Sequence, residues 1–297
     1  KPGFFFKKHA LNPYPAIILM TIPIILSSGS LFNFDLATVM ALAAETGFDG
    51  LELMVDYRRE THHLPHLQQL ITTYHLPILA VHSPFASLPH GWPADPVEII
   101  KSSVALAQGV GAQTVVVHPP PRWVRLQGLV IAPQQHWKLS VPVPVAGSGH
   151  FGRWLQQELP HFQAQTPVKI AVENMPRRWL GPLCLKPHHF NTPAQLRQFP
   201  YLTLDTTHVG TWREDLLEVY AQIKAKVTHI HLSNYNGREH QLLDNGSLPL
   251  AAFLAQLVKD GFAGLVSLEL GPVSLQAEDE DKLRQNLRDS LAFCRQG

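Results

Sequence analysis

Cysteine is scarce in this 297-residue chain, which contains only Cys184 and Cys294. The two residues stand far apart and match neither the spacing of a cysteine metal site nor that of a disulfide framework. This argues against a disulfide-rich secreted domain and favours buried free thiols in a reducing compartment. We therefore expect a cytoplasmic protein.

An excess of charge of either sign is also missing. The chain has 24 lysine and arginine residues against 23 aspartate and glutamate residues, for a formal net charge of +1. A chain so near neutrality has no general electrostatic footprint for nucleic acid. Its 45% of hydrophobic residues is ordinary for a globular protein with a large core.

Hydrophobic runs long enough to cross a bilayer, about 20 residues, are not found either. The nearest candidate, residues 16–26, is interrupted by Pro23 and is followed by no convincing small-residue cleavage site. We interpret it as a first strand, preceded by an extended arm over residues 1–15, and expect no membrane association. No linker divides residues 16–297, so they are expected to form one domain.

Histidine, in contrast, is abundant, with 17 residues. Some fall in predicted loops or on polar helix positions and are expected at the surface: His62, His63, His66, His75, His90, His188 and His189. The histidines that directly follow predicted strands are the better candidates for function.

Six short apolar runs each end on an imidazole or a carboxylate. A run of this kind, bounded by turn residues, predicts a strand that is buried on both faces. The six terminal residues are His82, His118, Glu173, Asp205, His231 and Glu269. Core packing alone does not require a metal-type ligand at the same end of every strand.

Helices are predicted between the strands. Asp35 can cap a helix that Gly47 ends, and Pro96 suits the first turn of a helix ended by Gly109 and Gly111. Eight strands that alternate with helices predict a single (β/α)8 TIM barrel of parallel strands. Residues 122–149, after the fourth strand, are expected to be an irregular insertion, and residues 175–190 a second irregular loop. The carboxyl ends of barrel strands meet on one face, so the six terminal residues should converge there.

Glu173, Asp205, His231 and Glu269 come from four consecutive predicted strands. Three crowded carboxylates repel one another unless a cation lies among them. With an imidazole they suit a divalent metal such as Mn, Mg, Co or Zn. His82 and His118 could hold a second ion together with a bridging Glu173, or hydrogen-bond substrate hydroxyls. His208 and His240 could help to hold a third ion, so a second or third zinc stays open.

Several segments together resemble the xylose-isomerase-like barrel superfamily, which includes sugar isomerases and epimerases as well as zinc-type endonucleases for abasic DNA sites. The likeness extends from residue 17 to about residue 295. The segments that carry it are Gly47-Phe48-Asp49-Gly50-Leu51-Glu52, Val172-Glu173-Asn174, Asp205-Thr206-Thr207-His208, His231-Leu232 and Leu268-Glu269.

The resemblance implies a metal-dependent isomerase or epimerase acting on a small sugar or sugar phosphate, with a homo-oligomer as an open option. Glu173, Asp205, His231 and Glu269 would then bind one ion. Glu173 and Glu269 would also act as the catalytic base and acid, moving a proton through a metal-stabilised enediolate. The residues expected to bind substrate are His82, His118, His208, Arg238 and His240.

Two alternatives remain. In a zinc-dependent phosphodiesterase of the endonuclease type, His82 and His118 would serve a second zinc, and basic and aromatic residues of 122–154 would contact nucleic acid. Arg238 departs from that pattern, which has an aspartate at this position. A non-catalytic ligand-binding barrel is the other alternative, favoured only if no ion binds. Metal content distinguishes the three hypotheses.

Overall fold

The computed structural model describes residues 22–85, 88–132, 137–145 and 148–296. The expected arm, residues 1–15, and residues 16–21 of the predicted first strand lie outside these ranges. Within them the first strand begins at Ile24, directly after Pro23, whose carbonyl accepts a hydrogen bond from Val266 N. The start of the strand is thus later than expected, since proline has no N–H to donate to a neighbouring strand.

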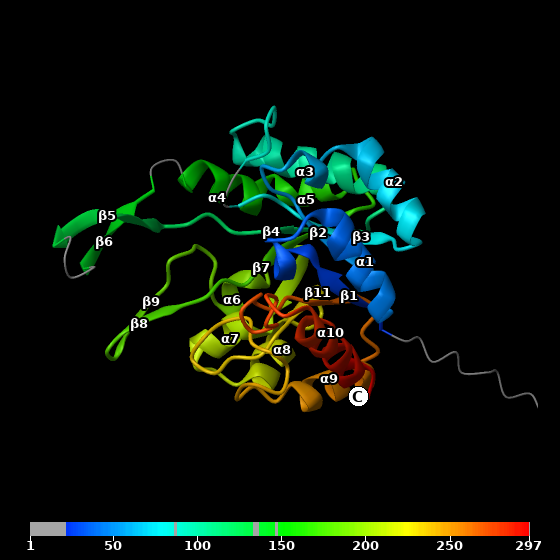
Figure 1. Ribbon diagram of the computed structural model, residues 1–297. Helices are drawn as coiled ribbons and strands as arrows, with labels where there is room; N and C mark the ends of the chain where they lie inside the picture. The colour runs from blue at the N-terminus through cyan, green and yellow to red at the C-terminus, as the bar shows by residue number, and fades with distance from the viewer. Residues whose placement is uncertain (1–21, 86–87, 133–136, 146–147, 297) are drawn as a thin grey trace, which may run out of the picture.

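Eight parallel strands close into a barrel (Figure 1), which confirms the predicted (β/α)8 fold. Around the barrel the order is β1, β12, β11, β10, β7, β4, β3 and β2, after which β2 pairs with β1. The bounds are β1 Ile24–Ser27, β2 Gly50–Met54, β3 Ile78–His82, β4 Thr114–Val117, β7 Lys169–Glu173, β10 Tyr201–Asp205, β11 Val227–Leu232 and β12 Leu265–Leu268.

Helices surround the barrel. They are α1 Leu36–Thr46, α2 Leu64–Tyr74, α3 Pro96–Val110, α4 Ser148–Gln157, α5 Leu159–Gln163, α6 Pro193–Leu196, α7 Thr206–Trp212, α8 Leu216–Ile223, α9 Leu250–Lys259 and α10 Glu280–Arg295, with short 3-10 turns η1 Ser28–Leu31 and η2 Arg59–Thr61. The Asp35 side chain accepts from Thr38 N and caps α1, as predicted. Gly47, with φ 92°, ends this helix.

One helix end differs from the prediction, and one helix was not predicted. Gly109 lies inside α3, which ends before Gly111 with its φ of 80°. A Cβ at Gly109 would fall 2.8 Å from Leu64 Cδ1, so this glycine permits a close approach of α2 and does not stop the helix. The segment 206–212 is the helix α7, and its N-cap is Asp205. Because Asp205 is both the last residue of β10 and the N-cap of α7, no loop residues separate the strand from the helix, and the sequence has no turn signal that marks the helix start.

The insertion after β4 is more regular than expected. It forms the antiparallel strands β5 Trp123–Ala132 and β6 Trp137–Pro144, and the second loop forms β8 Arg178–Leu180 and β9 Leu183–Leu185. Both hairpins project from the same side of the barrel (Figure 1). The prediction of irregular loops was wrong because Pro142 and Pro144 resemble strand breakers. Every strand of a two-stranded sheet has a free edge, where a missing N–H is tolerated.

The inside of the barrel has an apolar floor and a polar upper part. Ile25, Ala80 and Leu265 form a small buried cluster separate from the main core. Above it the interior carries buried polar side chains, among them Glu52, Thr203, His229 and Ser267. The main core lies between strands and helices. The centre of this barrel is therefore filled by polar as well as apolar side chains.

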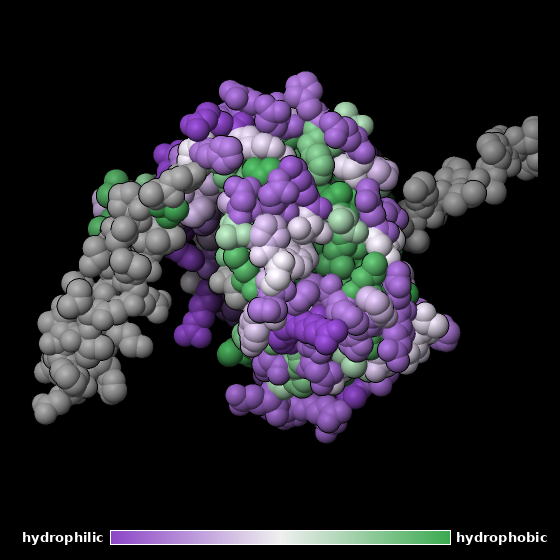
Figure 2. Space-filling view, turned by 90° about the horizontal axis from the view of Figure 1, so that it is seen from above, coloured by the Kyte–Doolittle hydropathy of each residue, from purple (hydrophilic) through white to green (hydrophobic). Residues whose placement is uncertain are grey.

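On the outside, hydrophilic residues cover much of the face seen from above, and hydrophobic residues show between them (Figure 2). Among the described residues, no helix is both long enough and apolar enough to span a membrane.

Candidate metal centre

The residues predicted from the strand ends come together at one end of the barrel. Glu173, Asp205, His231 and Glu269 each offer a ligand atom, and these atoms lie within 4.8 Å of one another. Glu173 and Asp205 end β7 and β10, His231 lies in β11, and Glu269 directly follows β12. Parallel strands with matched ends bring these residues together, although 96 positions separate Glu173 from Glu269 in the sequence (269 − 173).

His231 Nδ1 lies at the centre of this group. It is 2.8 Å from Glu269 Oε2, 3.4 Å from Glu173 Oε1 and 4.0 Å from Asp205 Oδ2. Two ligands on one zinc ion, at about 2.0–2.1 Å from it and at a tetrahedral angle, are about 3.3 Å apart. The donor atoms therefore have approximately the mutual spacing that one shared ion requires.

Three atoms of the group test whether a metal fits. Asp205 Oδ2 is buried and has no hydrogen-bond partner among the described residues. Glu173 Oε2 and His231 Nδ1 are buried too and meet only ionisable side chains, the nearest being His118 at 2.9 Å and Glu269 at 2.8 Å. Leaving a buried polar atom unsatisfied costs about 1–3 kcal/mol. Atoms of this kind converging from three strands match the donor set of a divalent cation, so the residues present fit a metal ion.

A second group shares Glu173. His118 Nε2 lies 2.9 Å and His82 Nε2 3.6 Å from Glu173 Oε2, while Glu173 Oε1 faces His231. The ligand atoms of His82, His118 and Glu173 also lie within 4.8 Å of one another. Glu173 is thus placed to bridge two ions, one on each oxygen.

A third group consists of Asp205, His208 and His240. The rings of His208 and His240 lie 5.8 Å apart, edge to face. Arg238, predicted to bind substrate, is exposed in the loop after Gly237. Among the described residues its side chain has no hydrogen bond or ion pair, so the structure does not join Arg238 to the other predicted site residues.

Three imidazoles of the site are anchored through Nδ1 on backbone carbonyls, and in His208 this nitrogen also faces the site, 3.3 Å from Glu173 Oε1 and 3.4 Å from Asp205 Oδ2. His82 Nδ1 lies 2.9 Å from Ser83 O, His208 Nδ1 2.8 Å from Asn174 O, and His240 Nδ1 3.1 Å from Glu269 O. A carbonyl oxygen only accepts, so each Nδ1 carries the hydrogen. In His82 and His240, Nε2 is left to bind a ligand, an arrangement that fixes ring orientation at metal sites.

The electrostatics of the metal-free cluster fit a cation site. Burial raises the pKa of Asp205 to about 6 despite the attraction of His208 and His240, and Glu173 and Glu269 add to the increase. Burial opposes ionisation of Glu269 too, but His231 and His240 lower its pKa to about 2. The carboxylates of Asp205 and Glu173 overcome burial at His208 and raise its pKa to about 10. Without metal, histidine protons therefore supply the positive charge.

The sequence model of the xylose isomerase-like TIM barrel matches residues 40–296. The chain belongs to this family. A relative from Mycobacterium leprae (strain TN), an uncharacterized protein, is 28% identical over 295 residues, covering 91% of this chain and 95% of the relative.

Solved structures share this xylose isomerase-like fold. The 3-keto-D-glucoside 4-epimerase YcjR from E. coli superposes with a TM-score of 0.64 at 19% identity, covering 93% of this chain and 100% of the epimerase. A family 2 AP endonuclease from Brucella melitensis superposes with a TM-score of 0.59 at 14% identity, covering 84% of this chain and 94% of that one. At these identities the likeness establishes the fold only.

Three contributors to the site of this xylose isomerase-like barrel were missed from the sequence. Asn174 accepts from Asp205 N at 2.7 Å and donates to Asp205 O at 3.0 Å, so it joins the ends of β7 and β10. Glu52 lies under His231. His188, expected at the surface, is half-buried beside His118, and burial together with the charges of His118 and His208 lowers its pKa to about 3. Strand alternation places Glu52 on the opposite face from Leu51 and Leu53, but its contact with His231 depends on a distant strand and could not be predicted from that pattern.

Two hollows open beside the cluster. One, of about 390 Å³, is lined by Glu269 and His240 together with Phe32, Tyr57 and Phe85. The other, of about 490 Å³, is lined by His118, His188 and Trp123, again with Phe85. The Phe85 ring packs against His82 and His118 at centroid distances of 5.3 and 4.6 Å. In this family member a ligand could therefore reach the acidic cluster from the side of Glu269.

Proposed function

We propose that this protein is a divalent-metal-dependent sugar epimerase or isomerase. The observation that carries the proposal is the convergence of three carboxylates on His231 Nδ1, with Glu269 also lining a hollow of about 390 Å³. The fold shared with a 3-keto-D-glucoside 4-epimerase supports it. Glu173, Asp205, His231 and Glu269 would hold the ion, which would polarise a substrate carbonyl and acidify the neighbouring C–H bond.

Glu173 and Glu269 are the proposed proton carriers. In the strand order β12, β11, β10, β7 they lie on either side of His231. Burial opposes ionisation of Glu173, but His118 and His231 keep its pKa well below the ordinary value, and the pKa of Glu269 is about 2. Both are ionised at neutral pH and can accept a proton. One would take the proton from carbon, giving an enediolate. The other would return a proton to that carbon only after taking one up from solvent, which the hollow beside Glu269 would admit.

Hydrogen-bonding groups at the rim would orient the substrate. His240 lines the same hollow as Glu269, with its Nε2 unanchored, and Tyr57 and Phe32 offer apolar surface to a sugar ring. His82, His118 and His208 would contact substrate oxygens from the side of Glu173. Sugar-binding sites combine a few placed polar groups with such apolar walls.

The test is deuterium incorporation from heavy water into a panel of free and phosphorylated ketoses, with the metal-loaded protein. We expect exchange at one C–H position, followed by NMR. Glu269→Gln should reduce the rate by about 10²-fold or more, as the loss of a general acid-base group does. Glu98→Gln, an exposed residue on α3, is the control and should leave the rate unchanged. A panel that shows no exchange with any metal would reject the proposal.

A zinc-dependent phosphodiesterase is the second candidate, favoured by the bridging position of Glu173. Its two oxygens face different histidines, His118 at 2.9 Å and His231 at 3.4 Å, which is suited to two ions rather than one. Paired metal ions are a common solution for phosphoester hydrolysis. The fold shared with a family 2 AP endonuclease agrees with this candidate as well.

Metal analysis and one assay separate the candidates. One bound ion per chain with deuterium exchange supports the epimerase. Two or three zinc ions with cleavage of abasic-site DNA and no exchange support the phosphodiesterase. A chain that binds a sugar but no metal would be a binding module.

A further inference from the structure

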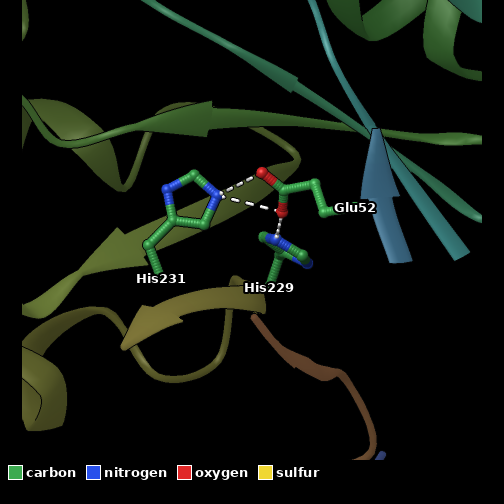
Figure 3. A group of neighbouring side chains, drawn as sticks. All are labelled: Glu52, His229 and His231. Atoms are coloured by element: carbon green, nitrogen blue, oxygen red, sulfur yellow. Dashed lines mark hydrogen bonds and ion pairs between the residues drawn. The ribbon is translucent and has the colours of Figure 1, made fainter. Parts of the chain in front are cut away.

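His231 differs from the other anchored histidines in how its ring is held. His82, His208 and His240 donate Nδ1–H to backbone carbonyls, whereas His231 turns Nδ1 toward the carboxylates and Nε2 toward a side chain, Glu52. Glu52 lies on β2, three strands away from β11 around the barrel. It reaches His231 through the interior (Figure 3).

Glu52 receives two imidazoles. His231 Nε2 lies 3.1 Å from each of its oxygens, and His229 Nε2 lies 2.5 Å from Oε2. A carboxylate only accepts, so both Nε2 atoms carry the hydrogen. Nδ1 of His231 is then the nitrogen that faces Glu173, Asp205 and Glu269, and a bound ion would take the place of the hydrogen that it directs at Glu269, 2.8 Å away, in the metal-free protein.

A glutamate and two histidines are also suitable metal ligands. The spacing argues against an ion between Glu52 and His229. Ligands on one zinc ion stand about 3.3 Å apart, whereas the 2.5 Å between His229 Nε2 and Glu52 Oε2 is that of a direct hydrogen bond. The group is better explained as a hydrogen-bonded support below the metal centre.

The surroundings make this support rigid. The side chains of Glu52, His229 and His231 are all 0% exposed, and the apolar floor of Ile25, Ala80 and Leu265 lies in the same interior. Charged hydrogen bonds inside a protein are stronger than in water, and a buried carboxylate has no solvent to turn to. His229 thus holds Glu52 in place, and Glu52 holds His231.

We propose that Glu52 and His229 form a positioning pair that fixes the orientation and tautomer of His231, so that Nδ1 is its metal-binding atom. This rests on the proposed function only in requiring an ion at the centre. It does not depend on which reaction follows. Carboxylates that orient a metal-bound histidine typically contribute about 10–100-fold to metal affinity.

The experiment measures metal affinity in place of activity. Zn²⁺ and Mn²⁺ dissociation constants would be obtained by chelator competition for the wild type, Glu52→Gln and Glu52→Leu. We expect Glu52→Gln to weaken binding about 10-fold or more, and the apolar variant to weaken it further. The matched control is Ser267→Ala, since Ser267 pairs with His231 in the sheet and is buried, but its hydroxyl has no hydrogen-bond partner among the described residues.

A spectroscopic signature separates positioning from general stability. In the zinc-loaded wild type, ¹⁵N spectra of labelled histidines should show His231 bound through Nδ1 with a hydrogen on Nε2. Wild-type affinity in Glu52→Gln, or binding of His231 through Nε2, would overturn the proposal, as would failure of the wild type to bind any ion. Should both Glu52 variants fail to fold, His229→Asn decides: a severalfold loss of affinity supports the pair, and an unchanged affinity rejects it. Tight binding without deuterium exchange would reject only the proposed function.

Discussion

Asp205→Asn should stabilise the metal-free protein while destroying its metal site. The side chain of Asp205 is buried, and its Oδ1 accepts from His208 N at 2.8 Å as the cap of α7. Asparagine keeps this acceptor. Its amide nitrogen would replace Oδ2, which has no hydrogen-bond partner among the described residues. The change removes a charge from a crowded acidic cluster without removing the helix cap.

The magnitude follows from the pKa of Asp205, which burial and the neighbouring carboxylates raise from 3.8 to about 6. Because the pKa is higher in the folded state, ionisation weakens the fold: wild-type stability falls as the pH rises from about 4 through about 6. At 1.36 kcal/mol per pH unit, a shift of about two units costs about 3 kcal/mol above pH 6. The Asp205→Asn variant would not incur this cost, although the lost attraction to His208 reduces the gain.

The assay is urea unfolding in the presence of a chelator. At pH 8 the variant should be more stable by up to about 3 kcal/mol, which corresponds to an increase in Tm of up to about 5 °C. The gain should shrink as the pH is lowered toward 5. Asp215→Asn makes the same substitution at an exposed cap, where the side chain accepts from Glu218 N at 2.9 Å. It should change stability by less than about 0.5 kcal/mol.

Metal should reverse the order. At about 1,000 times the dissociation constant a bound ion adds about 4.1 kcal/mol to the wild type, more than the variant's advantage. The variant, with one ligand lost, should gain little. A variant that is less stable than the wild type at pH 8 in chelator would refute the reasoning. It would mean that the ionised carboxylate of Asp205 is well compensated without an ion.

Other predictions concern the scaffold. Asp95→Ala removes the side chain that accepts from Val97 N and Glu98 N at 2.9 and 3.2 Å, and should cost about 1 kcal/mol in urea unfolding; Asp95→Asn should recover most of the loss. Gly264→Ala would place a methyl group against the Thr228 carbonyl, and should lower the free energy of unfolding by about 2 kcal/mol or more. A variant as stable as the wild type would show that the backbone can relax around this contact. Burial raises the pKa of the Cys294 thiol to about 12, so in Ellman titration of the native protein at pH 8 only Cys184, which is half-buried, should react; both should react in guanidinium.

Local patterns were sufficient for the fold class and the ligands of the candidate centre. The apolar runs before Glu173, Asp205, His231 and Glu269 mark buried strands, and caps such as Asp35 mark helix starts. The rule that barrel strands end on one face then brings these residues together. The β5–β6 hairpin was missed because the prolines of β6 resemble strand breakers, although an edge strand tolerates them. Helix α7 was missed because its N-cap, Asp205, is also the last residue of a strand.

The sequence by itself determined which strand ends carry carboxylates and imidazoles, because an apolar run and the residue that follows it are neighbours in the chain. It also placed His229, His231 and Glu52 on strands. Only the tertiary structure decided that Glu52 supports His231 from 179 positions away. That contact depends on barrel closure and on the register between β1, β2, β11 and β12. Register results from side chains of all these strands packing together, so no single segment encodes it.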